Sequence, residues 1–191
     1  MAAFASVVAS VAILFAALAR GSESGAEDGG LEMKTDLTHF DKEGKAIMVD
    51  VTAKSPTARQ AKARGQILMN EAAYQAVVTG TAAKGDVLGI ARIAGIMAAK
   101  RTGDLIPLCH PLAIASCQVD FQFLPDILAI EAVAIVKLTG QTGVEMEALT
   151  AVTVSLLTIY DMCKALDKQM QIEGVHLLHK SGGRSGLFER E

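Results

Sequence analysis

The longest helical pattern in the chain constrains its fold more than any other feature. It runs over residues 140–168, where apolar side chains recur every three or four residues. Two acidic residues in its first turn, Glu145 and Glu147, suit the positive end of a helix dipole. The helix therefore has one face to bury, formed by Val144, Leu149, Val152, Leu156, Ile159, Cys163 and Leu166.

Shorter patterns on both sides of this helix predict strands and two further helices. Residues 58–69 could form a charged helix or a strand, and we favour a strand because small and apolar residues occupy every second position. Asn70 and Gly80 suit the start and the end of a helix. Two prolines exclude regular structure from residues 102–112. The remaining predictions are strands at 46–51, 116–123, 127–138 and 171–180, and a helix at 86–101. The apolar stripe expected on this helix is formed by Val87, Ile90, Ala91, Ala94 and Ala98.

The order of these elements indicates the fold class. A strand, a helix pair, two strands, the long helix and a last strand follow one another as β-α-β-β-α-β. This order predicts an α+β sandwich whose helices pack on one face of an antiparallel sheet. The basic segment 181–186 is expected to be a loose tail.

The N-terminal 32 residues differ from the rest. The first 19 carry no charge and could just span a bilayer, and the Gly-rich acidic stretch that follows is typical of a disordered linker. Three explanations stay open: a secretory signal, a membrane anchor, or a start upstream of the true one, for which Met33 is the candidate. No Lys or Arg precedes the apolar run, as a signal peptide would normally require. We divide the chain into a leader with its linker, residues 1–32, and a single domain, residues 33–191.

Composition excludes several functional classes. A net charge of −3 leaves no excess of basic residues to bind a nucleic-acid backbone, and 4% aromatic residues are few for stacking on bases. Three cysteines without a CxxC pair fit neither a disulfide framework nor a zinc site. We therefore predict no metal site, no nucleic-acid partner and a reducing, cytoplasmic location, with membrane contact only through a retained leader.

Ionisable residues in constrained surroundings are the first candidates for a site. His110 lies between Pro107 and Pro111, and a rigid loop suits a positioned acid, base or hydrogen-bond donor as well as a structural histidine. Cys109 beside it fits a small buried thiol better than a nucleophile, because no base is evident nearby. Glu145 and Glu147 are two residues apart, so they cannot share a helix face unless the helix begins between them.

A second candidate cluster lies near the end of the long helix. Asp161 and Lys164 are three residues apart, so their side chains lie on one face of the helix. They could form an ion pair at the surface, or an acid-base pair if that face lines a cleft. Glu147 and Asp161 are separated by roughly 20 Å along the helix, at 1.5 Å per residue. If both act on one small ligand, they must come from different subunits. Lys84, just before a helix, is a candidate for binding an anion.

Seven segments together resemble the cyclic pyranopterin monophosphate synthase family, which performs the second step of molybdenum-cofactor biosynthesis. The resemblance extends over residues 37–188, beyond the leader. The segments are MVDV (48–51), KGDV (84–87), ARIAGI (91–96), AAKRTGDLIPLCHPL (98–112), TGVEMEALTAV (142–152), TIYDMCKAL (158–166) and KSGGRSG (180–186).

The resemblance implies a ferredoxin-like fold and a lyase that releases pyrophosphate. Its substrate would be (8S)-3′,8-cyclo-7,8-dihydroguanosine 5′-triphosphate, a nucleotide-derived small molecule, and its product cyclic pyranopterin monophosphate. The family implies a homohexamer, built as a trimer of dimers, with active sites at subunit interfaces. It implies no required cofactor, although Mg²⁺ could accompany the triphosphate as a counterion.

The family's functional residues transfer to matching positions in this chain. The catalytic group corresponds to Asp161, Lys164 and Lys84. Two departures, Gln141 in place of a basic residue and Arg184 in place of a lysine, affect the expected phosphate contacts. The implied substrate-binding residues are Leu108, Cys109, His110, Met146 and Glu147, with Glu145 and Asp50 as further contributors.

Two other classes of function stay open. A non-catalytic nucleotide-binding module of the same fold would keep the basic cluster without needing a reactive Asp161 and Lys164 pair. A membrane-anchored interaction protein would depend on the leader alone.

Overall fold

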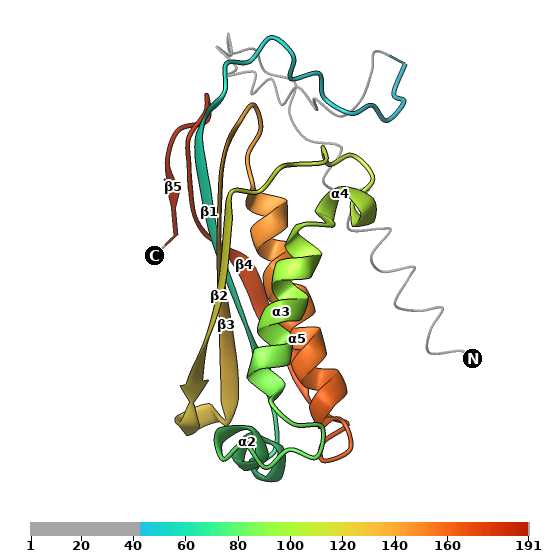
Figure 1. Ribbon diagram of the computed structural model, residues 1–191, viewed down its shortest axis with the longest axis vertical. Helices are drawn as coiled ribbons and strands as arrows, with labels where there is room; N and C mark the ends of the chain where they lie inside the picture. Colours follow the sequence, from blue (N-terminus) through green and yellow to red (C-terminus); the bar gives the residue numbers. More distant parts are fainter. Residues whose placement is uncertain (1–42, 191) are drawn as a thin grey trace, which may run out of the picture. The chain divides into compact units, whose positions relative to one another are not determined.

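An antiparallel sheet of five strands, with helices packed on one of its faces, forms the body of the protein (Figure 1). The computed structural model describes residues 43–190. Its elements in chain order are β1 (Thr57–Leu68), α2 (Glu71–Val78), α3 (Val87–Ala99), α4 (Thr102–Leu105), β2 (Ser116–Leu124), the 3-10 turn η1 (Pro125–Ile127), β3 (Ala129–Gly140), α5 (Glu145–Cys163), β4 (Gln171–Ser181) and β5 (Phe188–Glu189).

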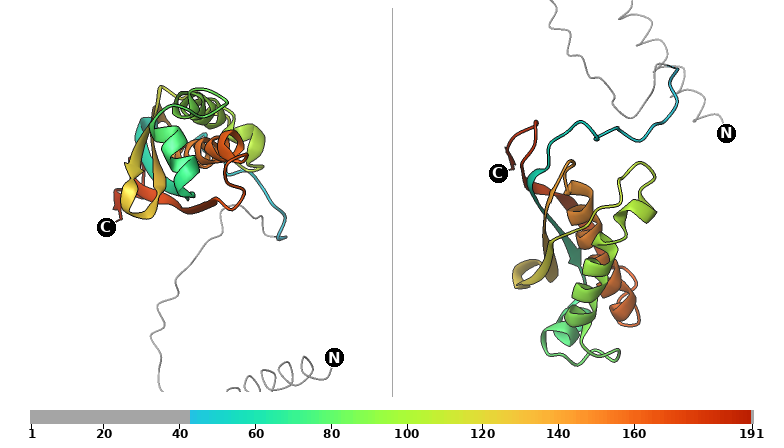
Figure 2. Two further views of the ribbon diagram at one scale, coloured as in Figure 1. Left: turned by 90° about the horizontal axis from the view of Figure 1, so that it is seen from below. Right: turned by 45° about the horizontal axis from the view of Figure 1, so that its top comes forward.

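The strand order confirms the predicted ferredoxin-like α+β class. The sheet runs β2-β3-β1-β4-β5, so β1 lies between β3 and β4 and pairs antiparallel with both. Residues 58–69 are confirmed as a strand, because Ala61, Ala63, Gly65 and Ile67 are all buried while the residues between them are not. Figure 2 shows α3 and α5 together on one side of the strands.

The long helix is confirmed as the centre of the core. Val152, Leu156 and Ile159 are fully buried against the sheet. By length and composition α5 could span a membrane, but half of its most apolar window is buried inside the protein, as expected for a core helix. The expected face is wrong at Leu166, which is exposed, since the helix ends at Cys163 and the backbone turns back there.

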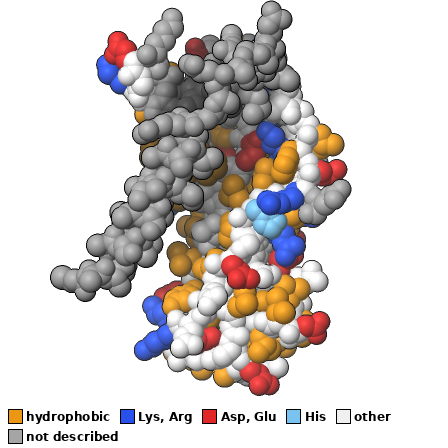
Figure 3. Space-filling model, turned by 180° about the vertical axis from the view of Figure 1, so that it is seen from behind, with side chains coloured by type: hydrophobic (Ala, Val, Ile, Leu, Met, Phe, Trp, Pro, Cys, Tyr) orange, Lys and Arg blue, Asp and Glu red, His pale blue; other side chains and the backbone are white. Residues whose placement is uncertain are grey.

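Small residues allow α3 and α5 to pack closely. A Cβ on Gly95 would meet Ser155 Oγ and would lie 2.8 Å from the carbonyl oxygen of Ala151. The buried hydroxyl of Ser155 donates to the carbonyl oxygen of Ala91 at 3.1 Å. The predicted apolar stripe of α3 is wrong at Ile90, which is 45% exposed on the outer side of the helix. Figure 3 shows apolar side chains interspersed with charged ones on one face of the described residues.

The starts of α2 and α3 follow the capping rules. The side chain of Asn70 accepts from the backbone N–H of Ala73, and that of Asp86 accepts from Gly89 N–H at 2.8 Å. Gly80 follows α2 at a positive φ of 69°, as predicted for a residue that ends a helix.

Three local predictions are wrong. Residues 46–51 form no strand beyond a single bridge at Ala46, because Asp50 caps a turn by accepting from the backbone N–H of Thr52 at 2.8 Å. Residues 102–105 form the short helix α4, since the first proline comes only at Pro107. The tail ends in β5, which pairs with β4. The predicted leader and linker lie outside the described residues.

Candidate functional site

Three candidate residues form one cluster near the C-terminal end of α5, which we call the acid-base cluster. Lys164 donates to Asp161 Oδ1 at 2.7 Å, and Lys84 donates to Asp161 Oδ2 at 2.9 Å. Lys84 also donates to the backbone carbonyl oxygen of Asp161 at 2.9 Å. Gly85, at φ 89°, provides the turn that brings Lys84 from the loop before α3 to α5.

The electrostatics of the acid-base cluster fix its charge state. Hydrogen bonds from Lys164 and then Lys84 lower the pKa of Asp161 to about 2. The same carboxylate raises the pKa of Lys164. At neutral pH the cluster therefore holds a carboxylate and an ammonium group. Both shifts move the pKa values away from neutral pH, so within this ion pair Asp161 is a weaker base, and Lys164 a weaker acid, than the free side chains.

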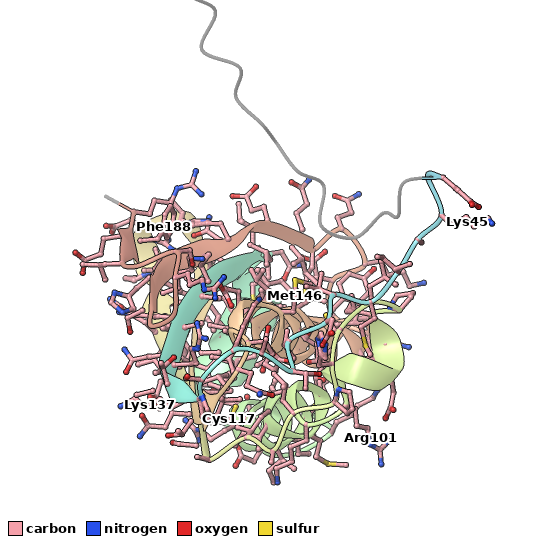
Figure 4. The ribbon with its side chains drawn as sticks, turned by 90° about the horizontal axis from the view of Figure 1, so that it is seen from above. Lys45, Arg101, Cys117, Lys137, Met146 and Phe188 are labelled. Carbon is pink, nitrogen blue, oxygen red and sulfur yellow. The ribbon has the colours of Figure 1, made fainter. Side chains whose placement is uncertain are left out.

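A cavity of about 360 Å³ lies at the opposite, N-terminal end of α5, and we call it the loop pocket. Three separate segments line it: the chain before β1, the loop after α4 and the start of α5. Figure 4 shows the segment from Lys45 crossing this end of the molecule beside Met146. The lining residues are Val49, Val51, Lys54, Leu108, Cys109, His110, Leu112, Thr142, Gly143, Glu145, Met146 and Glu147.

Six of the seven predicted substrate-binding residues line the loop pocket. Glu145 and Glu147 both do so, because Glu145 is the first residue of α5 and its side chain can turn off the helix end. Asp50 is exposed and does not line the cavity, although its neighbours Val49 and Val51 do. The hydrogen bonds from Thr52, and less strongly the nearby His110, lower the pKa of Asp50.

Burial controls the chemistry of the loop pocket. Glu147 is only 2% exposed, and loss of water raises the pKa of its carboxyl group. Burial, and then the charge of Glu147, raises the pKa of Cys109. A thiol with a raised pKa is a poor nucleophile at neutral pH, which supports the structural interpretation of Cys109.

A second cavity, of about 550 Å³, adjoins the loop pocket, and we call it the basic pocket. The two share Lys54, Thr142, Gly143 and Glu145. Arg184 is an expected phosphate contact, whereas Lys54 and Arg59 were not predicted from the sequence. Neither lies in a recognisable motif, and only the fold brings them to Arg184. The other lining residues are Ala53, Ser55, Thr57, Gln141, Gly183 and Ser185.

The acid-base cluster and the loop pocket do not meet within one chain. Asp161 and Glu147 are 14 residues apart on the same helix, which corresponds to about 21 Å at 1.5 Å per residue. Within residues 43–190, no group of three or more His, Cys, Asp or Glu side chains is placed to hold a metal ion.

Comparison with known proteins decides the family. The MoaC family profile matches residues 48–183. The chain belongs to the MoaC family. A relative from Clostridium botulinum named cyclic pyranopterin monophosphate synthase is 59% identical over 159 residues, covering 83% of this chain and all of that protein. Relatives of the same name from Novosphingobium aromaticivorans and Desulfitobacterium hafniense are 62% and 56% identical, covering 81% and 82% of this chain and 97% and 95% of their own lengths.

The range that matches the MoaC family covers the acid-base cluster, the loop pocket and all of the basic pocket except Arg184 and Ser185. The matched range runs from Met48, just before the loop pocket begins, to Gly183 in the basic pocket. The leader predicted at residues 1–32 lies outside the matched range.

Proposed function

We propose that this MoaC family member converts (8S)-3′,8-cyclo-7,8-dihydroguanosine 5′-triphosphate to cyclic pyranopterin monophosphate and releases pyrophosphate. The observation that carries the proposal is the pairing of two adjoining cavities with different chemistry. The loop pocket, with buried Glu147 and half-buried His110, suits a purine-derived ring that offers N–H donors. The basic pocket, with Lys54 and Arg184, suits a phosphate chain.

The acid-base cluster would move the protons. Opening a purine ring and closing a cyclic phosphate both need proton transfers and stabilised phosphate charge. In this proposal Asp161 accepts a proton, and Lys164 and Lys84 donate protons or bind phosphate oxygens. A phosphate that drew the two lysines away from Asp161 would raise the pKa of Asp161 from about 2 toward its ordinary value and make this carboxylate a better base.

A shared site requires a second copy of the chain. A two-fold axis crossing α5 near Val154, halfway between Glu147 and Asp161, would place each subunit's acid-base cluster at its partner's loop pocket. The charges are complementary, because two lysines would approach two glutamates. Each dimer would then contain two complete sites.

The outer face of α5 supports this arrangement. Residues spaced three or four apart run along it from one end to the other, and Leu157 on this line is 54% exposed. The neighbouring face of α3 exposes Ile93 and Met97. An exposed apolar helix layer of this kind suits a subunit interface. The residues along α5 are Met146, Thr150, Thr153, Leu157, Asp161 and Lys164.

The activity is tested with the full chain and the labile substrate generated in situ. We expect release of pyrophosphate together with a pterin that becomes fluorescent on oxidation. A protein that binds the substrate but forms neither product would be a nucleotide-binding module, and the proposed activity would be wrong.

Sharing of the site is tested by complementation. Asp161→Asn leaves the loop pocket intact, and Glu147→Gln leaves the acid-base cluster intact. Co-expressed at equal levels, the two inactive chains should regain about a quarter of the wild-type activity, because half the dimers are mixed and each has one intact site. Activity no higher than the sum of the two separate variants would contradict a shared site.

The finer features of the assembly and its surroundings belong to the same proposal. We expect the dimers to assemble as a homohexamer, a trimer of dimers, in the cytoplasm. No cofactor is required in this proposal, and Mg²⁺ would act only as a counterion of the triphosphate. Sedimentation velocity of the full chain checks the assembly, and turnover measured with and without EDTA checks the role of Mg²⁺.

A further inference from the structure

We propose that Arg59 is a positioning residue, which holds the β3–α5 loop in the shape that the loop pocket needs. This inference rests on the proposed function. Arg59 Nε donates to the carbonyl oxygen of Gly140 at 3.3 Å, and Nη2 donates to that of Gln141 at 3.1 Å. The loop continues directly through Thr142 and Gly143 to Glu145, all of which line the loop pocket. Arg59 itself lines the neighbouring basic pocket but not the loop pocket.

The C-terminal tail holds Arg59 from the other side. Gly182 and Gly183 both have positive φ, at 95° and 76°. A Cβ on Gly183 would collide with Arg59 Nη1, and one on Gly182 would collide with the carbonyl oxygen of Ala58. The tail can therefore lie over the guanidinium only because these two residues lack side chains.

Two further contacts tie the same loop in place. Lys180, at the end of β4, pairs with Glu145 Oε1 at 3.2 Å. The side-chain amide of Gln141 donates to the carbonyl oxygen of Thr52 at 3.3 Å, in the segment that also lines the loop pocket. The start of β1, the tail and the loop before α5 thus form one connected unit, with Arg59 at its centre.

The geometry distinguishes positioning from direct phosphate binding. Two donors of the planar guanidinium are already used on backbone carbonyl oxygens. A lysine could supply the charge for a phosphate, but its single ammonium cannot reproduce the fork that spans two carbonyl oxygens. A residue that binds phosphate needs the positive charge of its side chain, whereas a residue that positions this loop needs the planar fork of the guanidinium.

The test compares Arg59→Lys with Arg59→Gln in the full chain. We expect both to lower kcat to a similar extent, about 10- to 100-fold, because small displacements of a site cost this much. KM should change by less than about threefold, since Lys54 and Arg184 still bind the phosphates. Thermal unfolding should show that both variants are folded.

Glycine variants supply the matched control. Gly183→Ala should reproduce the loss of kcat, because its methyl group would displace the guanidinium. Gly186→Ala introduces a similar conformational strain at φ 66°, but nothing lies within 4 Å of its Cβ, so its kcat should stay within about twofold of wild type.

Two outcomes would overturn the proposal. If Arg59→Lys keeps the wild-type kcat, or if the Arg59 variants raise KM while kcat is preserved, Arg59 is a direct phosphate ligand or has no role. Wild-type protein that forms no product would instead contradict the proposed activity, so the two failures are distinguishable.

Discussion

At one end of α5, Asp161 is exposed and bound by two lysines, whereas at the other end Glu147 is buried and its pKa is raised by loss of water. The first end is built mainly from neighbouring residues of one helix. The second is built from segments spread between Val49 and Glu147. The Asp161–Lys164 pair is therefore organised locally, whereas the contact of Lys84 with Asp161 and the whole loop pocket exist only in the folded domain.

The largest effect is expected at the acid-base cluster. Asp161→Asn removes the proton acceptor, and we expect kcat to fall about 10³- to 10⁴-fold while substrate binding is retained. Asp161 is exposed, so the midpoint of thermal unfolding should hardly change. Steady-state turnover and equilibrium binding measure the two effects. Loss of binding together with turnover would mean that Asp161 is a ligand rather than an acid-base group.

A smaller loss of activity, with a gain in stability, is expected at the loop pocket. Glu147→Gln should lower kcat about 100-fold. The carboxyl group has a higher pKa in the folded protein than its ordinary value of 4.5, so its ionisation removes stability as the pH rises above that value.

The neutral amide avoids this cost. At pH 7 we expect the variant to unfold about 2 to 4 °C higher than wild type, and the two should converge near pH 4. Scanning fluorimetry across this pH range is the measurement. A lower unfolding temperature at pH 7 would mean that Glu147 has a stabilising partner in the assembled protein.

The smallest effect is a change in the pKa of Asp161. Because Lys164 makes the largest contribution, Lys164→Ala should raise this pKa from about 2 toward 3.8 by more than Lys84→Ala does. Carbon-13 NMR of labelled aspartate side chains would follow the titration. Lys137→Ala, on β3, is the control, and an equal change with this variant would show a general charge effect.

The lowered pKa of Asp161 also makes the stability of the fold depend on pH. The lowered pKa of Asp161 makes its ion pairs stabilising above pH 3.8, and this contribution disappears as the pH falls toward about 2. Removal of either lysine should therefore weaken the loss of stability with acid in that range.

Periodicity was sufficient to predict the layers of the fold. The alternation over residues 58–69 identified a strand with one buried face, and the long helical pattern identified the helix that covers it. Prediction failed where a local hydrogen bond competed with propensity, as at Asp50, whose side chain caps a turn instead of continuing a strand. It failed at Ile90 because a helix face that looks like core can also point outward.

Local sequence patterns were enough to specify the fold class, the α5 helix and the pairing of Asp161 with Lys164, because each depends on the spacing of residues close together in the chain. Only the tertiary structure brought Lys84 to Asp161, Arg59 to the β3–α5 loop and Lys54 to Arg184. These contacts join residues far apart in sequence. Their proximity depends on the order of the strands in the sheet and on the course of the loops, and no local sequence pattern specifies either of these.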